Sequence, residues 1–322
     1  MKAIVYEQYG SPDMLKLQEV PKPTPGAGEV LVKLHATALN AADWHMLRAD
    51  PLLVRFEAGL TAPKRKILGA DIAGQVEAVG AGVTQFRPGD EVYGEIASCG
   101  WGGFAEYVCA RETCLALKPA NLTWEQAAAV PMAGMTALQA VRDKANVQSG
   151  QSVLIHGAGG GVGTFAVQIA KVFGAEVTAV CGPRNVQRAR DLGADHVIDY
   201  TQQDFARSEQ QYDVILAVNG SRALTDYRRA LRPGGQYVMI GGSTGQMFQA
   251  LLLGPLFSLG GGRKMGNILA QVSQKDLIFL RELIEAGKIT PVIDRCYPLE
   301  KVPEAMRYLE EGHAEGKIVI RQ

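Results

Sequence analysis

Short β-prone runs separated by turn residues dominate residues 1–121. The apolar and β-branched positions cluster in four such runs, Lys2–Tyr6, Val30–Ala36, Gly74–Val79 and Glu91–Gly94. Proline and glycine stand between them, most densely in Pro21–Gly28. Closely spaced strands with turn residues between them are typical of an antiparallel sheet or barrel. We therefore expect the first part of the chain to be rich in β structure.

The pattern changes at about residue 122. Thr123 and Gln126 have the spacing of a capping box and precede an alanine-rich helical run. Pro131 is expected to end that helix, because proline cannot donate to the helical hydrogen-bond ladder.

From Gln151 onward, strand-like and helix-like runs alternate. The helix after residue 160 is marked by an apolar face that includes Val162, Phe165, Ile169 and Phe173. The expected strands are Ser152–His156, Glu176–Val180, His196–Ile198, Asp213–Val218 and Tyr237–Ile240, with a helix at Asn185–Leu192. Such alternation predicts right-handed crossovers and a doubly wound parallel sheet, so the fold class is α/β.

The end of the chain lacks this alternation. A helix is expected at Asp276–Ala286 and a last strand at Ile318–Ile320, while the Gly- and Leu-rich stretch 251–266 has no clear assignment. We predict a first domain over 1–121, a second over 122–265, and a return of 266–322 to the first.

Composition excludes several classes of protein. The chain has 322 residues, 33 Lys+Arg against 33 Asp+Glu, and 47% apolar residues. A neutral globular chain without a basic block is a poor candidate for binding nucleic acid or an anionic membrane. The first residues do not resemble a signal peptide. Five cysteines at irregular spacing make a disulfide framework unexpected and favour a reducing cytoplasm.

The strongest local motif is a glycine-rich loop between the strand at 152–156 and the helix that follows. Such a loop is typical of dinucleotide binding, because its glycines let the backbone approach a pyrophosphate at the helix N-terminus. We expect Gly160 to allow that approach and Gly163 to allow close helix–strand packing. No Gly-Lys-Ser/Thr follows, which excludes a P-loop. The loop residues assigned to the cofactor are Gly157, Gly160, Gly161, Val162 and Gly163.

The end of the next strand bears on the choice of cofactor. NAD sites place an acid there for the ribose 2′-hydroxyl, but this chain reads Val180-Cys181-Gly182-Pro183-Arg184. Arg184 is suited to pair with a 2′-phosphate, although a solvated helix-terminal arginine is the alternative. The pattern favours NADPH.

Together, several motifs resemble the medium-chain dehydrogenase/reductase family, and within it the zinc-free, zeta-crystallin-like NADPH:quinone oxidoreductases. The motifs lie along nearly the whole chain: Gly69–Gly74, Pro88–Gly94, Thr136-Ala137, Gly157–Gly163, Leu192–Asp195, Arg232–Gly235, Gly287–Pro291 and Gly312–Lys317. The resemblance implies a GroES-like β-rich domain and a Rossmann domain, with substrate in the cleft between them.

The resemblance also allows a test for zinc. The positions where zinc-dependent relatives carry ligands are Asn40, Ala70 and Met132 here, and these do not form a zinc site. We therefore expect no metal. Quinones and α,β-unsaturated carbonyls are already electrophilic, so that orientation beside the cofactor is the main requirement for hydride transfer.

Residue roles follow from the same resemblance. Asn40 would donate to the acceptor oxygen, while Asp43 is either part of the catalytic site or a structural hydrogen-bond acceptor. Trp44 would wall the pocket or pack in the core, and Asp71 would support other side chains. Besides the loop and Arg184, the expected cofactor contacts are Thr136, Tyr200, Asn219, Gly241 and Gly242. Tyr200 has an alternative as an ordinary surface tyrosine. Glu315 departs from the family's arginine, which weakens the preference for NADPH.

Three functions remain open at the level of sequence. The leading one is an NADPH-dependent quinone oxidoreductase, and the closest alternative reduces the double bond of alkenals or enones. A different class would be an NADPH-binding structural or regulatory protein with little turnover. Relatives are often dimers, and the apolar stretches Leu251–Leu259 and Ile268–Val272 are candidates for a subunit interface.

Overall fold

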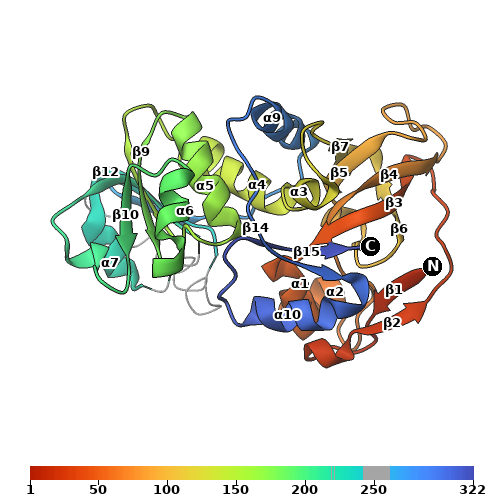
Figure 1. Cartoon of the computed structure of the whole chain (residues 1–322). Coiled ribbons are helices and arrows are strands. Elements are labelled where there is room, and N and C mark those ends of the chain that lie inside the picture. The colour runs from red at the N-terminus through yellow and green to blue at the C-terminus, as the bar shows by residue number, and fades with distance from the viewer. Residues whose placement is uncertain (219, 221, 242–261) are drawn as a thin grey trace. The chain divides into compact units, whose positions relative to one another are not determined.

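The computed structural model describes residues 1–218, 220, 222–241 and 262–322, which form two compact units (Figure 1). Unit 1 comprises Met1–Met135, Val272–Gly287 and Pro291–Gln322, and unit 2 comprises Thr136–Gln271 and Lys288–Thr290. The division into functional domains at residues 121 and 265 stays a prediction.

Unit 1 is built around a seven-stranded sheet with the order β14-β15-β3-β4-β5-β7, in which β6 also pairs with β3. Its strands are β3 (Glu29–Ala38), β4 (Asp71–Val79), β5 (Glu91–Glu95), β6 (Tyr107–Arg111), β7 (Leu115–Leu117), β14 (Ile293–Pro298) and β15 (Lys317–Arg321). All pairs are antiparallel except β14 with β15. A separate antiparallel pair joins β1 (Lys2–Val5) to β2 (Lys16–Glu19). The β-rich character predicted for residues 1–121 is confirmed.

Helices cover this sheet and bury an apolar cluster that is separate from the apolar core formed by the strands. They are α1 (Ala41–Arg48), α2 (Val54–Ala58), α3 (Trp124–Ala128), α4 (Pro131–Leu138, across the boundary of the units), α9 (Gln274–Glu285) and α10 (Val302–Glu310). Figure 1 shows α1 next to α10, and Leu47 of α1 shares a cluster with Val302 and Met306 of α10. The C-terminal segment thus completes the core beneath α1, the helix that follows Asn40.

The capping box at Thr123 is confirmed, but the role expected of Pro131 is wrong. The Thr123 hydroxyl accepts from the Gln126 N–H, and the Gln126 side chain accepts from the Thr123 N–H. The helix ends at Ala128, and Pro131 is instead the first residue of α4. Proline is favourable there, because the N–H it lacks would have no partner in the first turn of a helix.

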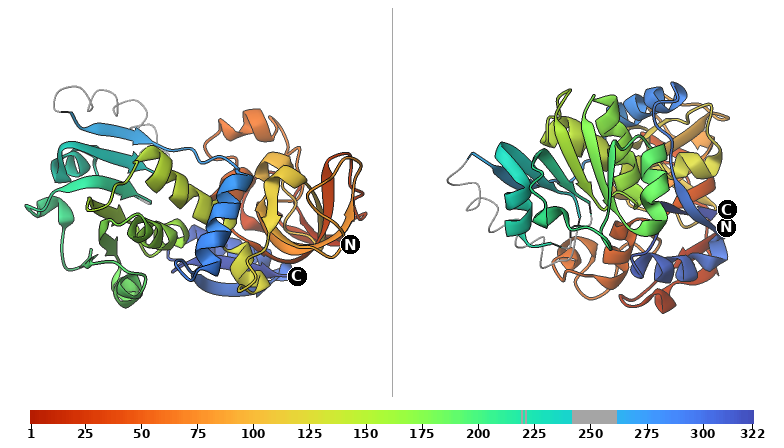
Figure 2. Two further views of the ribbon diagram at one scale, coloured as in Figure 1. Left: turned by 90° about the horizontal axis from the view of Figure 1, so that it is seen from above. Right: turned by 60° about the vertical axis from the view of Figure 1, so that its left-hand side comes forward.

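Unit 2 contains a six-stranded parallel sheet in the order β10-β9-β8-β11-β12-β13, which confirms the α/β fold class. The strands are β8 (Ser152–His156), β9 (Glu176–Cys181), β10 (His196–Asp199), β11 (Tyr212–Ala217), β12 (Leu231–Met239) and β13 (Lys264–Asn267). Among its described residues are the helices α5 (Gly161–Val172), α6 (Val186–Asp191) and α7 (Leu224–Ala230), and a π-helical segment spans Gln139–Lys144. The right-hand view of Figure 2 shows the strands of this sheet fanning out, in colours from green to blue.

One prediction about the cysteines is wrong. Cys99 and Cys114 form a disulfide, whereas Cys109, Cys181 and Cys296 are free. Each bonded cysteine lies close to the end of a strand, and β5 pairs with β7 through Gly94 and Leu115. That pairing, which the spacing in sequence does not reveal, brings the two cysteines together. No helix in the described ranges has the length and apolar character needed to cross a membrane.

Candidate active site

The glycine loop of unit 2 leaves the N-terminus of α5 open. Gly160 is the N-cap residue of α5, and as a glycine it offers no side-chain acceptor to the first turn. Among the described residues, a Cβ added at Gly160 would have only the Gly157 carbonyl oxygen within 4 Å, at 3.9 Å, so these residues leave the space in front of it open. The first N–H groups of a helix have no partner within it and attract anions. These residues therefore fit the pyrophosphate of a dinucleotide.

Gly163 has a different part in the same loop. A Cβ there would lie 2.1 Å from the Gly157 oxygen and 2.8 Å from the Ala158 Cα, so α5 starts in direct backbone contact with the end of β8. Gly157 has a φ of +91°, a conformation that favours glycine. Gly161 and Val162 form the first helical positions and are half-buried. Gly157 and Gly163 are therefore needed for the backbone conformation and packing of the loop, whereas the missing side chain of Gly160 leaves space for a ligand.

Next to this loop, the carboxyl ends of β9 and β10 bring Arg184 and Tyr200 into one region. Arg184 lies in a single 3₁₀ turn, Pro183–Asn185, and is exposed. The Tyr200 hydroxyl lies 3.0 Å from where a Cβ of Gly182 would be, and the Tyr200 N–H donates to the Cys181 carbonyl at 3.2 Å. Sequence separates these residues, but the parallel pairing of β9 with β10 brings their ends together.

The remaining cofactor contacts expected from the sequence fall into two groups. Thr136 is half-buried on α4, and Gly241 follows β12, where a Cβ would lie 2.7 Å from the Val218 carbonyl oxygen. Asn219 and Gly242 lie outside the described residues, as does the suggested interface segment 251–259.

In unit 1, a buried polar cluster surrounds Asp71, the first residue of β4. One carboxylate oxygen of Asp71 accepts from the Met132 N–H at 2.8 Å. The other accepts from the Asn40 amide nitrogen at 3.0 Å and from the Lys317 ammonium at 3.1 Å. Asp71 is fully buried, and Lys317 is 4% exposed. Of the three positions where the resemblance places metal ligands, Asn40 contacts Asp71 through its side chain and Met132 through its backbone N–H, while Ala70 directly precedes Asp71 in the chain.

Asp43, three residues after Asn40, accepts two backbone hydrogen bonds. They come from the Asn40 N–H at 2.8 Å and the Gly69 N–H at 2.9 Å. Complete burial is the largest effect on this carboxyl and raises its pKa to about 7, against the lowering effect of the two N–H groups. Asp43 therefore ties the start of α1 to the segment before β4. Trp44 is half-buried against the cluster that contains Leu47.

Glu95 completes this cluster from the neighbouring strand, because it pairs with Asp71 across β4 and β5. Its carboxyl accepts from the Ala97 N–H at 2.7 Å and is 5% exposed. Burial, followed by the nearby charge of Asp71, raises the pKa of Glu95 to about 7. The folded protein therefore keeps a proton on Glu95 up to near-neutral pH.

We expect the Glu95→Gln variant to be more stable than the unmodified protein at alkaline pH. The glutamine oxygen can still accept from the Ala97 N–H, but it never becomes a buried anion. Folding raises the pKa of Glu95 from 4.5 to about 7, so the free energy of unfolding falls as pH rises through that window. The advantage of the variant should be near zero below the lower value and reach about 1–3 kcal/mol at about pH 8.

Denaturant unfolding across the pH range measures this difference. Glu91→Gln, on the same strand but exposed, is the matched control and should give nearly the pH dependence of the unmodified protein. A constant difference between Glu95→Gln and the unmodified chain at all pH values would contradict a proton held by Glu95.

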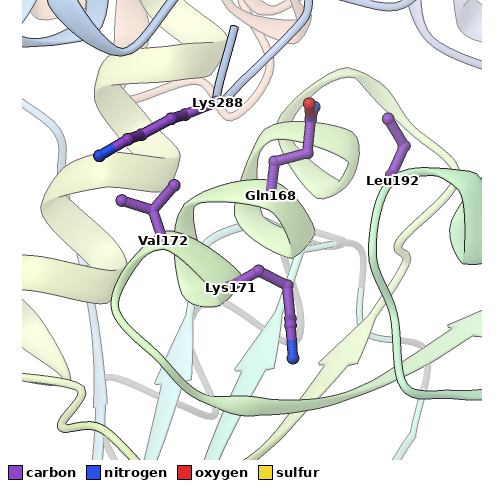
Figure 3. A pocket seen from close by; sticks show the side chains of 5 residues that line it. All are labelled: Gln168, Lys171, Val172, Leu192 and Lys288. Carbon is purple, nitrogen blue, oxygen red and sulfur yellow. The ribbon is translucent and has the colours of Figure 1, made fainter. Parts of the chain in front are cut away.

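One hollow on unit 2 lies away from the glycine loop. It is lined by Gln168, Lys171, Val172, Leu192 and Lys288, whose side chains Figure 3 shows. The Gln168 amide donates to the Thr290 carbonyl at 3.0 Å, and Lys171 donates to Asp195 at 2.7 Å. These contacts join α5 to its neighbours near the C-terminal end of the helix. The hollow is therefore not the candidate cofactor site, which lies at the opposite end of α5.

Sequence reasoning missed Lys317 and Glu95 as parts of the site. Lys317 is 246 positions from Asp71, and nothing in its spacing relates it to Asn40. In the sequence, Glu95 is only the residue that follows the strand predicted at Glu91–Gly94. Pairing of β4 with β5, and of β15 with β3, brings both side chains to Asp71.

Comparison with known proteins gives consistent results. Residues 26–120 match the alcohol dehydrogenase GroES-like domain, and residues 192–320 match the zinc-binding dehydrogenase model. The chloroplast envelope quinone oxidoreductase homolog of Arabidopsis thaliana is 34% identical over 99% of this chain and 98% of its own. An NADPH-dependent alkenal/one oxidoreductase, chloroplastic, from the same plant is 33% identical over 99% of this chain and 79% of its own. The structure of the quinone oxidoreductase from Coxiella burnetii has a TM-score of 0.88 and 31% identity, covering 100% and 99% of the two chains.

A GroES-like β-rich unit and a parallel-sheet unit with an open glycine loop define an oxidoreductase of the nicotinamide-dependent type. The chain belongs to the medium-chain dehydrogenase/reductase superfamily and is a quinone oxidoreductase-like member of it. The fold and the family expected from the sequence are thus confirmed.

Proposed function

We propose that this protein is an NADPH-dependent, zinc-independent oxidoreductase that reduces quinones. The single observation that best supports dinucleotide binding is the uncapped N-terminus of α5 with open space at Gly160. The absence of an acid between Val180 and Asn185, together with Arg184, supports NADPH rather than NADH. The quinone oxidoreductases among the relatives support the choice of acceptor.

The chain's own residues would bind and orient the reactants. Bound NADPH supplies a hydride. The first turn of α5 would hold the pyrophosphate, and Arg184 would pair with the 2′-phosphate. The Asn40 amide donates a hydrogen bond to the acceptor oxygen, where negative charge develops as hydride arrives. A proton then completes the hydroquinone, and we assign no side chain as its source.

Reduction of alkenals and enones is the second candidate, favoured by the alkenal/one oxidoreductase among the relatives. The same amide would stabilise an enolate oxygen. Steady-state oxidation of NADPH with a panel of quinones and a panel of enals and enones tests both. We expect turnover with quinones at a higher kcat/KM than with enals. The reverse order would favour the alternative, and binding of NADPH without turnover in either panel would indicate a structural or regulatory protein.

We expect the activity to be independent of metal. Asn40, Ala70 and Met132 replace the metal ligands of zinc-dependent relatives, and among the described residues no three His, Cys, Asp or Glu side chains are grouped to hold a metal ion. Exhaustive dialysis against a chelator should therefore leave kcat unchanged. Stoichiometric zinc in the purified protein, or a rate that falls on chelation and returns with zinc, would contradict this prediction.

The oligomeric state and location remain proposals as well. We propose a homodimer that acts in the cytoplasm on a small-molecule acceptor, with no nucleic acid as partner. Light scattering on the purified protein tests the dimer.

A further inference from the structure

Lys317 is a buried cation of unit 1 whose ammonium group has three hydrogen-bond partners. Its ammonium group donates to the Leu39 carbonyl at 3.0 Å, to the Asp71 carboxylate at 3.1 Å, and to the Asn40 side-chain oxygen. These three bonds use all three of its N–H donors. A lysine 4% exposed with every donor engaged is a fixed charge rather than a flexible surface group.

These contacts decide which way the Asn40 amide faces. Lysine can only donate, so the atom of Asn40 that meets it must be the oxygen. The amide nitrogen is then turned toward Asp71, to which it donates at 3.0 Å. A reversed amide would place its N–H groups against the ammonium and its oxygen against a carboxylate, and both contacts would be repulsive. One of the two amide orientations is therefore strongly favoured.

The favoured orientation leaves one N–H of Asn40 weakly engaged. The amide nitrogen of Asn40 also donates to the Ala38 carbonyl oxygen, at a distance of 3.4 Å, which is longer than the usual 2.7–3.2 Å for such bonds. Asn40 is 8% exposed, so it is buried apart from a small part of its surface. The weakly held N–H is thus the group that can turn to a reacting oxygen.

We propose that Lys317 is a positioning residue that keeps the Asn40 amide in the orientation that donates to the acceptor oxygen. This proposal rests on the proposed reduction of a quinone or enone. Without the ammonium group, the Asp71 carboxylate is left as the opposing partner of the amide, and once that charge is removed as well the amide can reverse and present its oxygen to the developing negative charge. Hydride transfer would then lose a preoriented donor, whereas dinucleotide binding in unit 2 would be unaffected.

The test uses a pair of substitutions that keeps the cluster neutral. Lys317→Met alone leaves Asp71 buried without its partner, which destabilises the fold. Lys317→Met combined with Asp71→Asn removes both charges, and the new amide at position 71 can still accept from the Met132 N–H. It can also donate to the oxygen of Asn40, so that this variant favours the reversed orientation. Lys171→Met, which removes a lysine paired with Asp195 in unit 2, is the control.

We expect the double variant to keep its melting temperature and NADPH dissociation constant and to lose roughly 100-fold in kcat. Asn40→Ala should cost a similar factor in the unmodified protein and almost nothing further in the double variant, because both changes remove one donor. Full kcat in the folded double variant would overturn the proposal, as would losses that multiply when Asn40→Ala is added. Lys171→Met should retain the kcat of the unmodified protein.

A second measurement does not depend on turnover. In protein carrying isotope-labelled asparagine, the Asn40 side-chain resonances, assigned by their loss in Asn40→Ala, should shift in the double variant and not in Lys171→Met. If the unmodified protein reduces neither panel, the proposed function fails, and these resonances still test the orientation. Unchanged resonances in the double variant would overturn the role of Lys317.

Discussion

Gly160→Val is expected to lower the affinity for NADPH by about 100-fold or more while leaving the fold intact. Gly160 has φ −84° and ψ 176°, extended backbone that valine adopts readily, and open space lies beside it. The new side chain would occupy the volume in front of the first N–H groups of α5. Loss of two hydrogen bonds to a charged phosphate, at about 1.5 kcal/mol or more each, corresponds to about two decades in affinity. Fluorescence titration with NADPH and thermal unfolding measure the two quantities.

Gly163→Ala is the matched contrast within the same loop. Its Cβ would lie 2.1 Å from the Gly157 oxygen, so this smaller substitution should lower the melting temperature clearly. A dissociation constant for NADPH that Gly160→Val leaves unchanged would mean that the pyrophosphate does not bind at this helix. A melting temperature lowered as much by Gly160→Val as by Gly163→Ala would show that Gly160 serves the fold instead.

Arg184→Ala should raise the KM for NADPH by roughly 10- to 150-fold and leave the KM for NADH nearly unchanged. The range corresponds to about 1.5–3 kcal/mol for a charge-assisted hydrogen bond between arginine and a phosphate. Arg184 is exposed in the turn after β9, close in sequence to Gly182, against which Tyr200 lies. Because NADH lacks the 2′-phosphate, it should lose nothing when the guanidinium is removed. Initial rates over a range of NADPH and NADH concentrations give the KM for each cofactor.

Arg190→Ala provides the control for this prediction. Arg190 is an exposed arginine of α6, so its removal changes the local charge without touching the turn at Pro183–Asn185. Its effect on either KM should be within about twofold, because exposed charges are screened over roughly 8–10 Å. Equal losses for NADPH and NADH in Arg184→Ala, or equal use of both cofactors by the unmodified protein, would assign Arg184 to something other than the 2′-phosphate.

The elements that sequence predicted well are those with a clear local signal. β8 has the predicted limits, Ser152–His156, because a short apolar run directly before a glycine loop is bounded on both sides. The capping box at Thr123 was found because both partners lie within one helical turn. By contrast, β13 begins inside the stretch 251–266, which has no clear assignment from sequence, and α7 and α10 had no predicted counterpart. Elements with weak local preference are set by packing, which a single sequence does not display.

The residues of the candidate site also differ in whether a local signal in the sequence identifies them. The glycine loop and the turn after β9 are contiguous in sequence, so residues such as Gly160 and Arg184 could be named from motif and order alone, and their role is a prediction for binding experiments. Lys317 and Glu95 could not be named, because they reach Asp71 only through strand pairing over long separations. The disulfide between Cys99 and Cys114 could not be predicted either, because it also depends on the pairing of two strands.

The sequence by itself determined the alternation of strand and helix, the parallel sheet, the family and the position of the glycine-rich loop, since each follows from periodicity or from short motifs. Only the tertiary structure decided that Asn40 faces Lys317 and Asp71 and that burial raises the pKa of Glu95 to about 7. The physical reason is that hydrogen-bond partners and desolvation depend on which side chains meet in space. Here the side chains are brought together by the pairing of β3, β4, β5 and β15, strands that come from opposite ends of the chain.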